Sequence, residues 1–375
     1  MVLLNWKSCI TAVTLTAISL TASKSALAVS LYSVTDLGSL TGEAYSYGTG
    51  INDSGEVAIN SLARSFFYSN GSLKTISPLL GDNQLAVTGI NNLGQVVGNS
   101  VNSNNFTGNN PFLYSNDLTQ PLPIQNAIPY AINDRTQIVG GAGELGPFLY
   151  SDGTATSIGT SGTVAYSLNN LGQVVGILNS GTAFLYENGQ TTDLGTLLGD
   201  GYSQANDIND SGQVVGISGL TGVDDGRAFL YSSSTGLQDL GRLRPTDLFS
   251  FAGGINNLGQ VVGFSGTNNN FFAPDGNGLR AFLYSDNTLY DLNDLIAPGS
   301  DAGFTLTAAS AINNNGQIAG RGAVNGELRA FLLTPVSSVS VAEPTSGVPI
   351  LSFGIVVTLF AALKRKRHFS SAAIQ

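Results

Sequence analysis

Side chains that could carry covalent chemistry are scarce in this chain of 375 residues. The single Cys, Cys9, and the single His, His368, stand close to the two ends. Removal of an N-terminal signal would take Cys9 away, and His368 lies in a basic tail outside the repeated region. The sequence therefore excludes a Cys nucleophile, a His general base and a His-rich metal site in the folded region.

Carboxylates remain, because hydrolysis of a glycosidic bond by two acidic residues needs no His. Asp224 and Asp225 form the only adjacent acidic pair, and charge patterning favours a solvated loop there. Recurring Asn-Asp and Asn-Asn pairs resemble calcium ligands, yet no calcium loop with a closing Glu follows them. Residues 141–146 match a dinucleotide-binding loop by letter, but we expect a strand, not a helix, directly after them. We therefore expect no catalytic residue, no metal and no cofactor.

The main internal feature of the chain is a short string that recurs seven times. In each copy, Ile or Leu is followed by Asn and then by Asp or Asn. Consecutive copies lie 36 to 57 residues apart, a spacing typical of supersecondary repeats. The seven Asn residues that open the strings are Asn52, Asn91, Asn133, Asn169, Asn209, Asn256 and Asn313.

Each string belongs to a unit with four recurring segments, in the order Asp-Leu-Gly, Ala-x-x-Ile-Asn, Gln-Val-Val-Gly and Ala-Phe-Leu-Tyr. These segments predict four short strands per unit. The Asn-Asp-Ser-Gly stretch between the second and third predicts a hairpin turn, because Asn and Asp bond to their own backbone and Gly supplies a positive φ. Thr136 replaces that Gly in the third unit, so we expect a distorted turn there.

The apolar pattern predicts how these strands assemble. Val214-Val215 and Phe229-Leu230-Tyr231 are continuous apolar runs, which indicates sheets that are covered on both faces. Seven four-stranded sheets covered by their neighbours make an all-β, seven-bladed β-propeller, over residues 29–336. The alternative is an open β-repeat array or a stacked β-solenoid, but four strands per ~40 residues is propeller spacing. Closing the ring should require all of residues 31–333.

These units resemble the HAF family of extracellular repeats, which is named for a His-Ala-Phe run. Arg takes the place of the His in this chain, at Arg227, Arg280 and Arg329, each followed by Ala-Phe. The resemblance spans residues 31–333. It implies export and an association with extracellular polymer, and it implies little about activity.

Loop length is what differs most between the units. If the strands run up and down, the loops before the second strand and before the fourth leave one face. All large insertions belong to these loops: 100–110, 218–226, 243–251, 266–278 and 293–307. Irregular loops over a rigid scaffold are common binding sites, although loops also tolerate insertions that serve no function. The insertion residues best suited to grip a sugar or a peptide are Arg242, Arg244, Phe271, Phe272 and Asp275.

Both ends of the chain predict export. Residues 1–28 combine Lys7, a short apolar stretch and Ala26-Leu27-Ala28, the pattern of a cleaved secretory signal. Residues 348–363 are nearly all apolar, and residues 364–367 are all basic. Positive residues stay on the cytoplasmic side, so we expect a transmembrane segment at 348–363 and a cytoplasmic tail at 364–375.

Residues 337–347 form a linker that contains Val341, Ala342, Glu343 and Pro344. This motif, the apolar segment and the basic tail, in that order, resemble the PEP-CTERM sorting signal. The resemblance implies processing by an exosortase-like protease. Ala342 departs from the family pattern, which usually has its first Pro there.

The folded region is acidic. Once the signal is removed, 24 acidic residues stand against 9 basic ones before Glu343, a net charge of about −15. Nucleic acid is not an expected partner, because an acidic body repels phosphate backbones. The sequence thus predicts an exported, surface-sorted, non-catalytic repeat protein that serves as a binding or structural module. The resemblance to the HAF family implies that it works at the cell surface or in extracellular polymer, with a polysaccharide or a surface protein as partner. The alternative is a carboxylate-dependent glycan hydrolase or lyase in the funnel of a propeller.

Overall fold

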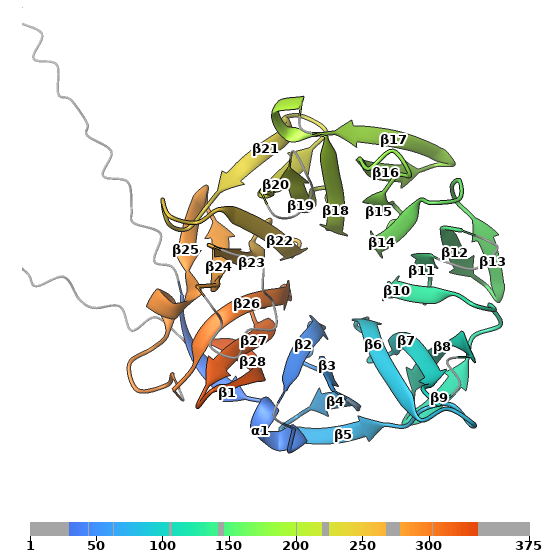
Figure 1. Ribbon diagram of the computed structural model, residues 1–375, viewed down its shortest axis with the longest axis horizontal. Coiled ribbons are helices and arrows are strands. Elements are labelled where there is room, and N and C mark those ends of the chain that lie inside the picture. The colour runs from blue at the N-terminus through green and yellow to red at the C-terminus, as the bar shows by residue number, and fades with distance from the viewer. Residues whose placement is uncertain are drawn as a thin grey trace, which may run out of the picture. The chain divides into compact units, whose positions relative to one another are not determined.

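The computed structural model describes residues 30–336 except 44, 63, 105–106, 142–145, 200, 220–224, 268–277 and 302. These residues form seven four-stranded antiparallel sheets around a central axis (Figure 1). The prediction of a seven-bladed β-propeller is therefore confirmed, and the open array and the solenoid are wrong. The expected signal peptide, sorting motif and transmembrane segment lie outside the described residues, within which no helix is long and apolar enough to cross a membrane.

The strands of each blade run from the axis outwards, in chain order for blades 1 to 6. Blades 1 and 2 are β2 (Ser46–Ile51), β3 (Val57–Ser61), β4 (Ser65–Ser69) and β5 (Ser72–Ile76), then β6 (Gln84–Ile90), β7 (Val96–Asn102), β8 (Thr107–Ser115) and β9 (Leu118–Pro121). Blades 3 and 4 are β10 (Ile128–Ile132), β11 (Ile138–Gly141), β12 (Phe148–Ser151) and β13 (Thr154–Ser157), then β14 (Val164–Leu168), β15 (Val174–Ile177), β16 (Ala183–Glu187) and β17 (Gln190–Gly195).

Blades 5 and 6 are β18 (Tyr202–Ile208), β19 (Val214–Gly219), β20 (Arg227–Ser232) and β21 (Gly236–Gly241), then β22 (Phe249–Ile255), β23 (Val261–Gly266), β24 (Arg280–Ser285) and β25 (Thr288–Asp291). Blade 7 joins both ends of the propeller: β26 (Thr305–Ile312), β27 (Ile318–Val324), β28 (Glu327–Val336) and, outermost, β1 (Leu31–Asp36). One short helix, α1 (Gly38–Thr41), and 3₁₀ turns at Leu197–Gly199 and Leu292–Leu295 lie between blades.

The sheets are offset from the sequence unit by one strand, which corrects our expectation. The Asp-Leu-Gly strand does not open the sheet of its own unit but is the outermost strand of the preceding blade. Asp239 in β21 pairs with Phe229, and Asp36 in β1 pairs with Phe331. Inside the chain the reason is local: β17 and β21 each follow an Ala-Phe-Leu-Tyr strand after a tight turn and pair with its free edge. In blade 7 this offset places the first strand of the chain beside the last.

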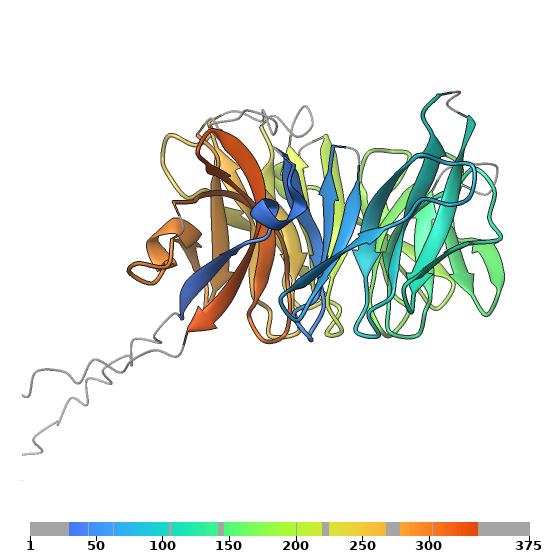
Figure 2. The ribbon, with the colours of Figure 1, turned by 90° about the horizontal axis from the view of Figure 1, so that it is seen from below.

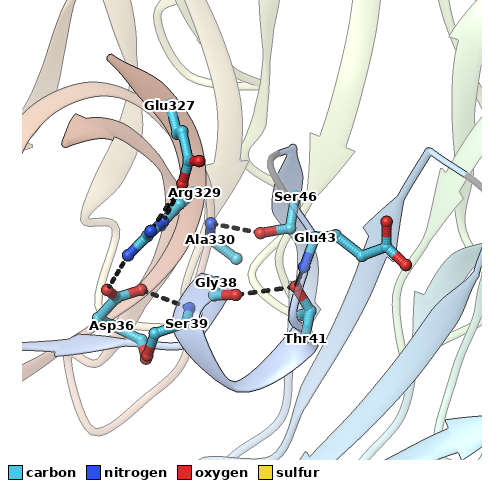
Figure 3. A network of polar contacts seen from close by, with 9 residues as sticks. All are labelled: Asp36, Gly38, Ser39, Thr41, Glu43, Ser46, Glu327, Arg329 and Ala330. Atoms are coloured by element: carbon cyan, nitrogen blue, oxygen red, sulfur yellow. Dashed lines mark hydrogen bonds and ion pairs between the residues drawn. The ribbon is translucent and has the colours of Figure 1, made fainter. Parts of the chain in front are cut away.

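Polar contacts hold this closure together (Figure 3). Arg329 of β28 donates a hydrogen bond to the carboxylate of Asp36 in β1 at 3.0 Å. The backbone N–H of Ala330 donates to the hydroxyl of Ser46 in β2 at 3.0 Å, across the junction of blades 7 and 1. The same backbone-to-serine contact recurs inside the ring, at Ala183 with Ser203 (2.8 Å) and at Ala228 with Ser250 (2.9 Å). In this contact the closing junction matches the junction of blades 4 and 5 and that of blades 5 and 6.

Apolar side chains join every blade to both neighbours. A separate buried cluster lies at each of the seven junctions. At the junction of blades 4 and 5, Val175 and Leu185 pack with Ile208 and Phe229. Every residue of β19 is buried. Both faces of each sheet are thus covered, which explains the continuous apolar runs in the sequence.

A glycine in the second strand lets six of the seven blades pack tightly. A Cβ at this position would lie 1.9 to 2.2 Å from a carbonyl oxygen of the inner strand, at Gly98, Gly140, Gly176, Gly216, Gly263 and Gly320. Blade 1 carries Ile59 instead, and its partner on the inner strand is Gly48. In blade 2 the corresponding pair is Gly98 and Val87. In blade 1 the large residue of the pair therefore lies on the second strand and the glycine on the inner strand, the reverse of blade 2. Each pair still combines one large residue with one glycine, so the strands can approach closely in both blades.

The turn of the third unit is regular, so the expected distortion is wrong. Thr136 has φ of 58°, in the left-handed region that Gly94 occupies in the second unit with φ of 71°. Its N–H donates to the backbone oxygen of Asn133 at 3.0 Å, as in the other turns. Its hydroxyl also donates to Gln95 in the neighbouring blade at 2.9 Å. This extra contact helps to offset the strain of a β-branched residue in that region.

The propeller has two different faces (Figure 2). The turn face carries the Asn-containing turns and the hairpins to the outermost strands. The loop face carries the connections between second and third strands and between blades. The described residues that flank the five insertions leave their strands at the loop face, as the alternation of strands predicted.

Candidate functional site

The recurring Asn residues form a closed ring at the turn face. Each side-chain oxygen accepts hydrogen bonds from its own turn, as Asn209 does from the N–H groups of Ser211 and Gln213 at 3.0 Å. Each side-chain nitrogen donates to the backbone oxygen of the equivalent Asn in the next blade, at 2.8 to 3.0 Å around all seven blades. These residues are 3 to 4% exposed. The repeated string therefore serves both the turn and the junction between blades.

The residue after each Asn makes a second ring of three Asp and four Asn, in which no two Asp are neighbours. Its N–H donates to the side-chain oxygen of the equivalent residue in the next blade at 2.8 to 2.9 Å. Asn92 also donates to both neighbouring carboxylates, Asp53 at 3.2 Å and Asp134 at 3.0 Å. Carboxamides thus separate the carboxylates around an opening of about 160 Å³. Among the described residues, no three acidic side chains gather closely enough to hold a metal ion.

The same inner strands line a wider pocket, of about 490 Å³, on the side of the propeller away from this ring. We call it the loop-face funnel. Its lining includes side chains from all seven inner strands and from three second strands: Tyr47, Thr49, Asn60, Thr88, Tyr130, Tyr166, Asn206, Phe251, Phe264, Ala308, Ser310 and Arg321.

The funnel is lined by a position of the inner strands at which the residue type varies between blades. The residue three before the ring Asn is different in most blades, namely Thr49, Thr88, Tyr130, Tyr166, Asn206, Gly253 and Ser310. On the same strands the ring Asn never changes. The fold therefore requires Asn at the turn-face end of each inner strand, whereas the residue type three positions earlier can vary to suit a ligand.

Aromatic rings form part of the funnel surface. Tyr130 of β10 and Tyr166 of β14 occupy equivalent positions in neighbouring blades, with ring centroids 5.3 Å apart and planes at 66°. We call these two residues the tyrosine wall. In blade 6, Phe251 stacks on Phe264 with centroids 5.0 Å apart. Burial raises the pKa of both wall tyrosines, that of Tyr166 to about 12. The wall is therefore uncharged at physiological pH and keeps its hydroxyl donors.

Hydrogen bonds fix the polar side chains of the funnel before any ligand binds. Asn60 of β3 donates to the hydroxyl of Thr49 at 3.0 Å and to that of Tyr47 at 3.3 Å. Asn206 of β18 donates to the backbone oxygen of Ala252 at 2.8 Å. Such preorganisation lowers the entropy lost on binding.

Arg321 of β27 is the only charged side chain among the described residues that line the funnel. It is 7% exposed and lies beside the hydroxyls of Tyr45 and Tyr47. Burial lowers the pKa of its guanidinium, and the neighbouring Tyr45 opposes that shift. An arginine stays protonated in proteins, so the funnel contains one positive charge from its described lining.

Carboxylates do not line the funnel within the described part of the chain. Asp207 of β18 is a partly buried residue whose carboxylate accepts hydrogen bonds from Ser167 at 2.7 Å and from the N–H of Ile255 at 2.9 Å. These contacts tie blade 5 to blades 4 and 6, and burial raises the pKa of Asp207. The two facing acids that glycoside cleavage needs are not among the described lining residues.

The sequence-predicted binding residues lie elsewhere. Arg242 and Arg244 line a separate pocket of about 450 Å³ beside β21, and Arg244 donates to Asp247 at 2.9 Å. Asp247 is buried and also accepts a hydrogen bond from Ser265 at 2.7 Å, so Arg244 anchors its own loop. The other predicted residues lie outside the described ones: Phe271, Phe272 and Asp275, and the sorting motif Val341, Ala342, Glu343 and Pro344.

The funnel residues are not among those predicted from the sequence. Insertions are the most conspicuous departures from the repeat, and they direct attention to the loops. A second signal lies inside the Ala-x-x-Ile-Asn strand, where the ring Asn persists while the residue three before it ranges from Gly to Tyr. Variation at one fixed position of a repeated strand could therefore have indicated the funnel.

Comparisons with known proteins place the fold but not a function. A family model described as a protein of unknown function (DUF3466) matches residues 199–334, which include most of blades 5 to 7. No curated protein matches the sequence significantly. A chain in the crystal structure of the mitotic checkpoint complex is similar, with a TM-score of 0.50 and 13% identity over 86% of this chain and 98% of that one.

The extracellular domain of a putative one component system from B. thetaiotaomicron has a TM-score of 0.48 and 15% identity, over 80% of this chain and 39% of that chain. A structural genomics protein of unknown function from the same organism has a TM-score of 0.40 and 10% identity, over 77% of this chain and 90% of that chain. At these TM-scores neither likeness carries an argument about this chain, and the likeness to the chain of the mitotic checkpoint complex shows the fold alone.

Proposed function

We propose that this protein is an exported, non-catalytic binding module of the cell surface, and that its loop-face funnel binds a saccharide. The observation that carries the proposal is the tyrosine wall, which stands at positions that the fold leaves free. A sugar ring presents a face of C–H groups that packs on an aromatic ring and hydroxyls that need hydrogen-bonding partners.

The remaining lining suits such a ligand. Thr49, Thr88, Asn206 and Ser310 place hydroxyls and carboxamides around the wall. The funnel volume of about 490 Å³ falls within the range of small-molecule sites. Aromatic surface with a few fixed polar groups is the usual composition of such sites.

A glycan array probed with the full-length chain identifies a ligand, and two substitutions then test the funnel. We expect Tyr130→Ala and Tyr166→Ala each to weaken binding by about fivefold or more, because aromatic packing contributes about 1 kcal/mol per ring. Calorimetric titration measures the effect. Tyr290→Ala, on the outermost strand β25, is the matched control and should bind like wild type. Unchanged affinity in the Tyr130 and Tyr166 variants would show that the ligand binds elsewhere, and cleavage of the bound glycan would contradict a non-catalytic role.

Export rests on the two ends of the chain, and surface sorting rests on Glu343-Pro344, the apolar segment and the basic tail. An exosortase-like protease would remove that tail. We expect intact-mass measurement of the surface protein to show the loss of residues 364–367 together with the signal. Recovery of a surface protein that still ends at Gln375 would indicate a retained anchor instead.

A further inference from the structure

The lining of the loop-face funnel is unequal around the axis. The tyrosine wall belongs to blades 3 and 4, whereas Arg321 belongs to blade 7. In a ring of seven blades, blade 7 lies opposite the junction of blades 3 and 4, and Figure 1 shows β26 across the axis from β10 and β14. The funnel therefore has an uncharged aromatic side and a cationic side that face each other.

The residues around Arg321 are small or uncharged. Ala308, Ala309 and Ser310 of β26 and Gly253 of β22 leave room on this side of the funnel. On the other side of Arg321 in the ring stands Tyr47 of blade 1, whose hydroxyl is held by Asn60. Electrostatic attraction is stronger in such a partly desolvated pocket than in water.

A planar guanidinium matches the geometry of a carboxylate, to which it donates charge-assisted hydrogen bonds. A hexuronic acid combines this carboxylate with a pyranose ring whose C–H face can pack on tyrosine. A saccharide that contains such a residue presents sugar rings for the tyrosine wall and a carboxylate for the cationic side.

We infer that the funnel selects a saccharide that contains a hexuronic acid residue: a sugar ring of this saccharide packs on Tyr130 and Tyr166, and the hexuronic carboxylate binds Arg321 on the opposite side. This inference rests on the proposed saccharide-binding function and names the ligand class. The protein body has a net charge of about −15 before Glu343, which disfavours a dense polyanion. The ligand is therefore an acidic residue at a chain end or among neutral sugars.

The test compares matched ligands. Tetrasaccharides of glucose, galactose and mannose are each prepared with one terminal hexuronic acid and again as the methyl ester of that acid, which removes the charge and keeps the shape. Calorimetric titration of the full-length chain measures both. We expect at least one acid to bind about tenfold tighter than its ester, the effect of a charge-assisted hydrogen bond in a partly buried site.

Variants then assign the preference to its residue. Arg321→Gln should reduce the acid-to-ester ratio to about one, while Arg227→Gln, outside the funnel, should leave it unchanged. The wild-type ratio needs no variant, so the test holds even if Arg321→Gln fails to fold. Equal binding of acid and ester, or a preference that survives Arg321→Gln, overturns the inference. If the acid and the ester bind equally and their binding depends on Tyr130 and Tyr166, the proposed saccharide binding stands and the preference for a hexuronic acid fails. If no tetrasaccharide binds, the proposed saccharide binding and the hexuronic acid preference both fail.

Discussion

Deleting β1, residues 31–36, is expected to unfold the whole propeller and not only blade 7. The deletion bares the edge of β28, with which all six residues of β1 pair. It also removes Tyr32, which is 2% exposed in the cluster between blades 6 and 7, and disturbs the neighbouring Leu37, which is 0% exposed. Losing buried side chains of this size costs about 2 to 5 kcal/mol each, comparable with the whole stability of many domains.

Differential scanning calorimetry measures this effect. A chain that lacks residues 337–375 is the matched control, because it keeps every strand of the propeller and should melt like the full-length protein. The β1 deletion should show no cooperative transition, or one at a much lower temperature. A near-native melting temperature after the deletion would mean that closure between blades 7 and 1 contributes little to the stability of the ring.

The same substitution at two adjacent glycines of β11 should destabilise the protein strongly at one position and hardly at the other. A Cβ at Gly140 would lie 2.1 Å from the carbonyl oxygen of Ile128 and 2.8 Å from the ring of Phe148. A Cβ at Gly141 would meet nothing closer than Val164, at 3.4 Å. Gly140→Ala should therefore destabilise the protein by about 3 kcal/mol, since neither a backbone oxygen nor a packed ring can move away.

Thermal melting compares the two variants directly. We expect Gly140→Ala to lower the melting temperature by roughly 6 °C or more, and Gly141→Ala to stay within about 1 kcal/mol of wild type. If Gly140→Ala melts with the wild type, the close approach of the first and second strands is wrong.

The fold was predictable because the seven strings are strongly alike and their apolar runs are continuous. Spacing and burial pattern gave the number of blades, the strands and the opposite placement of turns and insertions. The one-strand offset between the sheets and the sequence units was not predictable in this way. A repeat in sequence marks where a unit recurs, whereas pairing of Asp36 with Phe331 depends on which strand edge lies free in space.

The candidate site was harder to predict than the fold. Arg244 has a side chain that could bind a ligand, but the structure shows it bonded to the buried Asp247. Tyr130 and Tyr166 are 36 residues apart in sequence, and only the ring brings their side chains to a centroid distance of 5.3 Å. Similarly, the string with Asn209 indicated a turn. The hydrogen bond from the Asn209 side chain to the backbone oxygen of Asn256, 47 residues away, could be seen only once the structure showed the two blades side by side.

The crystal structure of the full-length chain with its tightest oligosaccharide tests the central claim most directly, namely that the inner strands hold a fixed ring at the turn face and a binding site at the loop face. We predict a sugar ring packed on Tyr130 and Tyr166 inside the loop-face funnel, with the Asn ring unchanged. A ligand bound on the outer strands, or in the pocket beside Arg242 and Arg244 with the funnel empty, would contradict that claim.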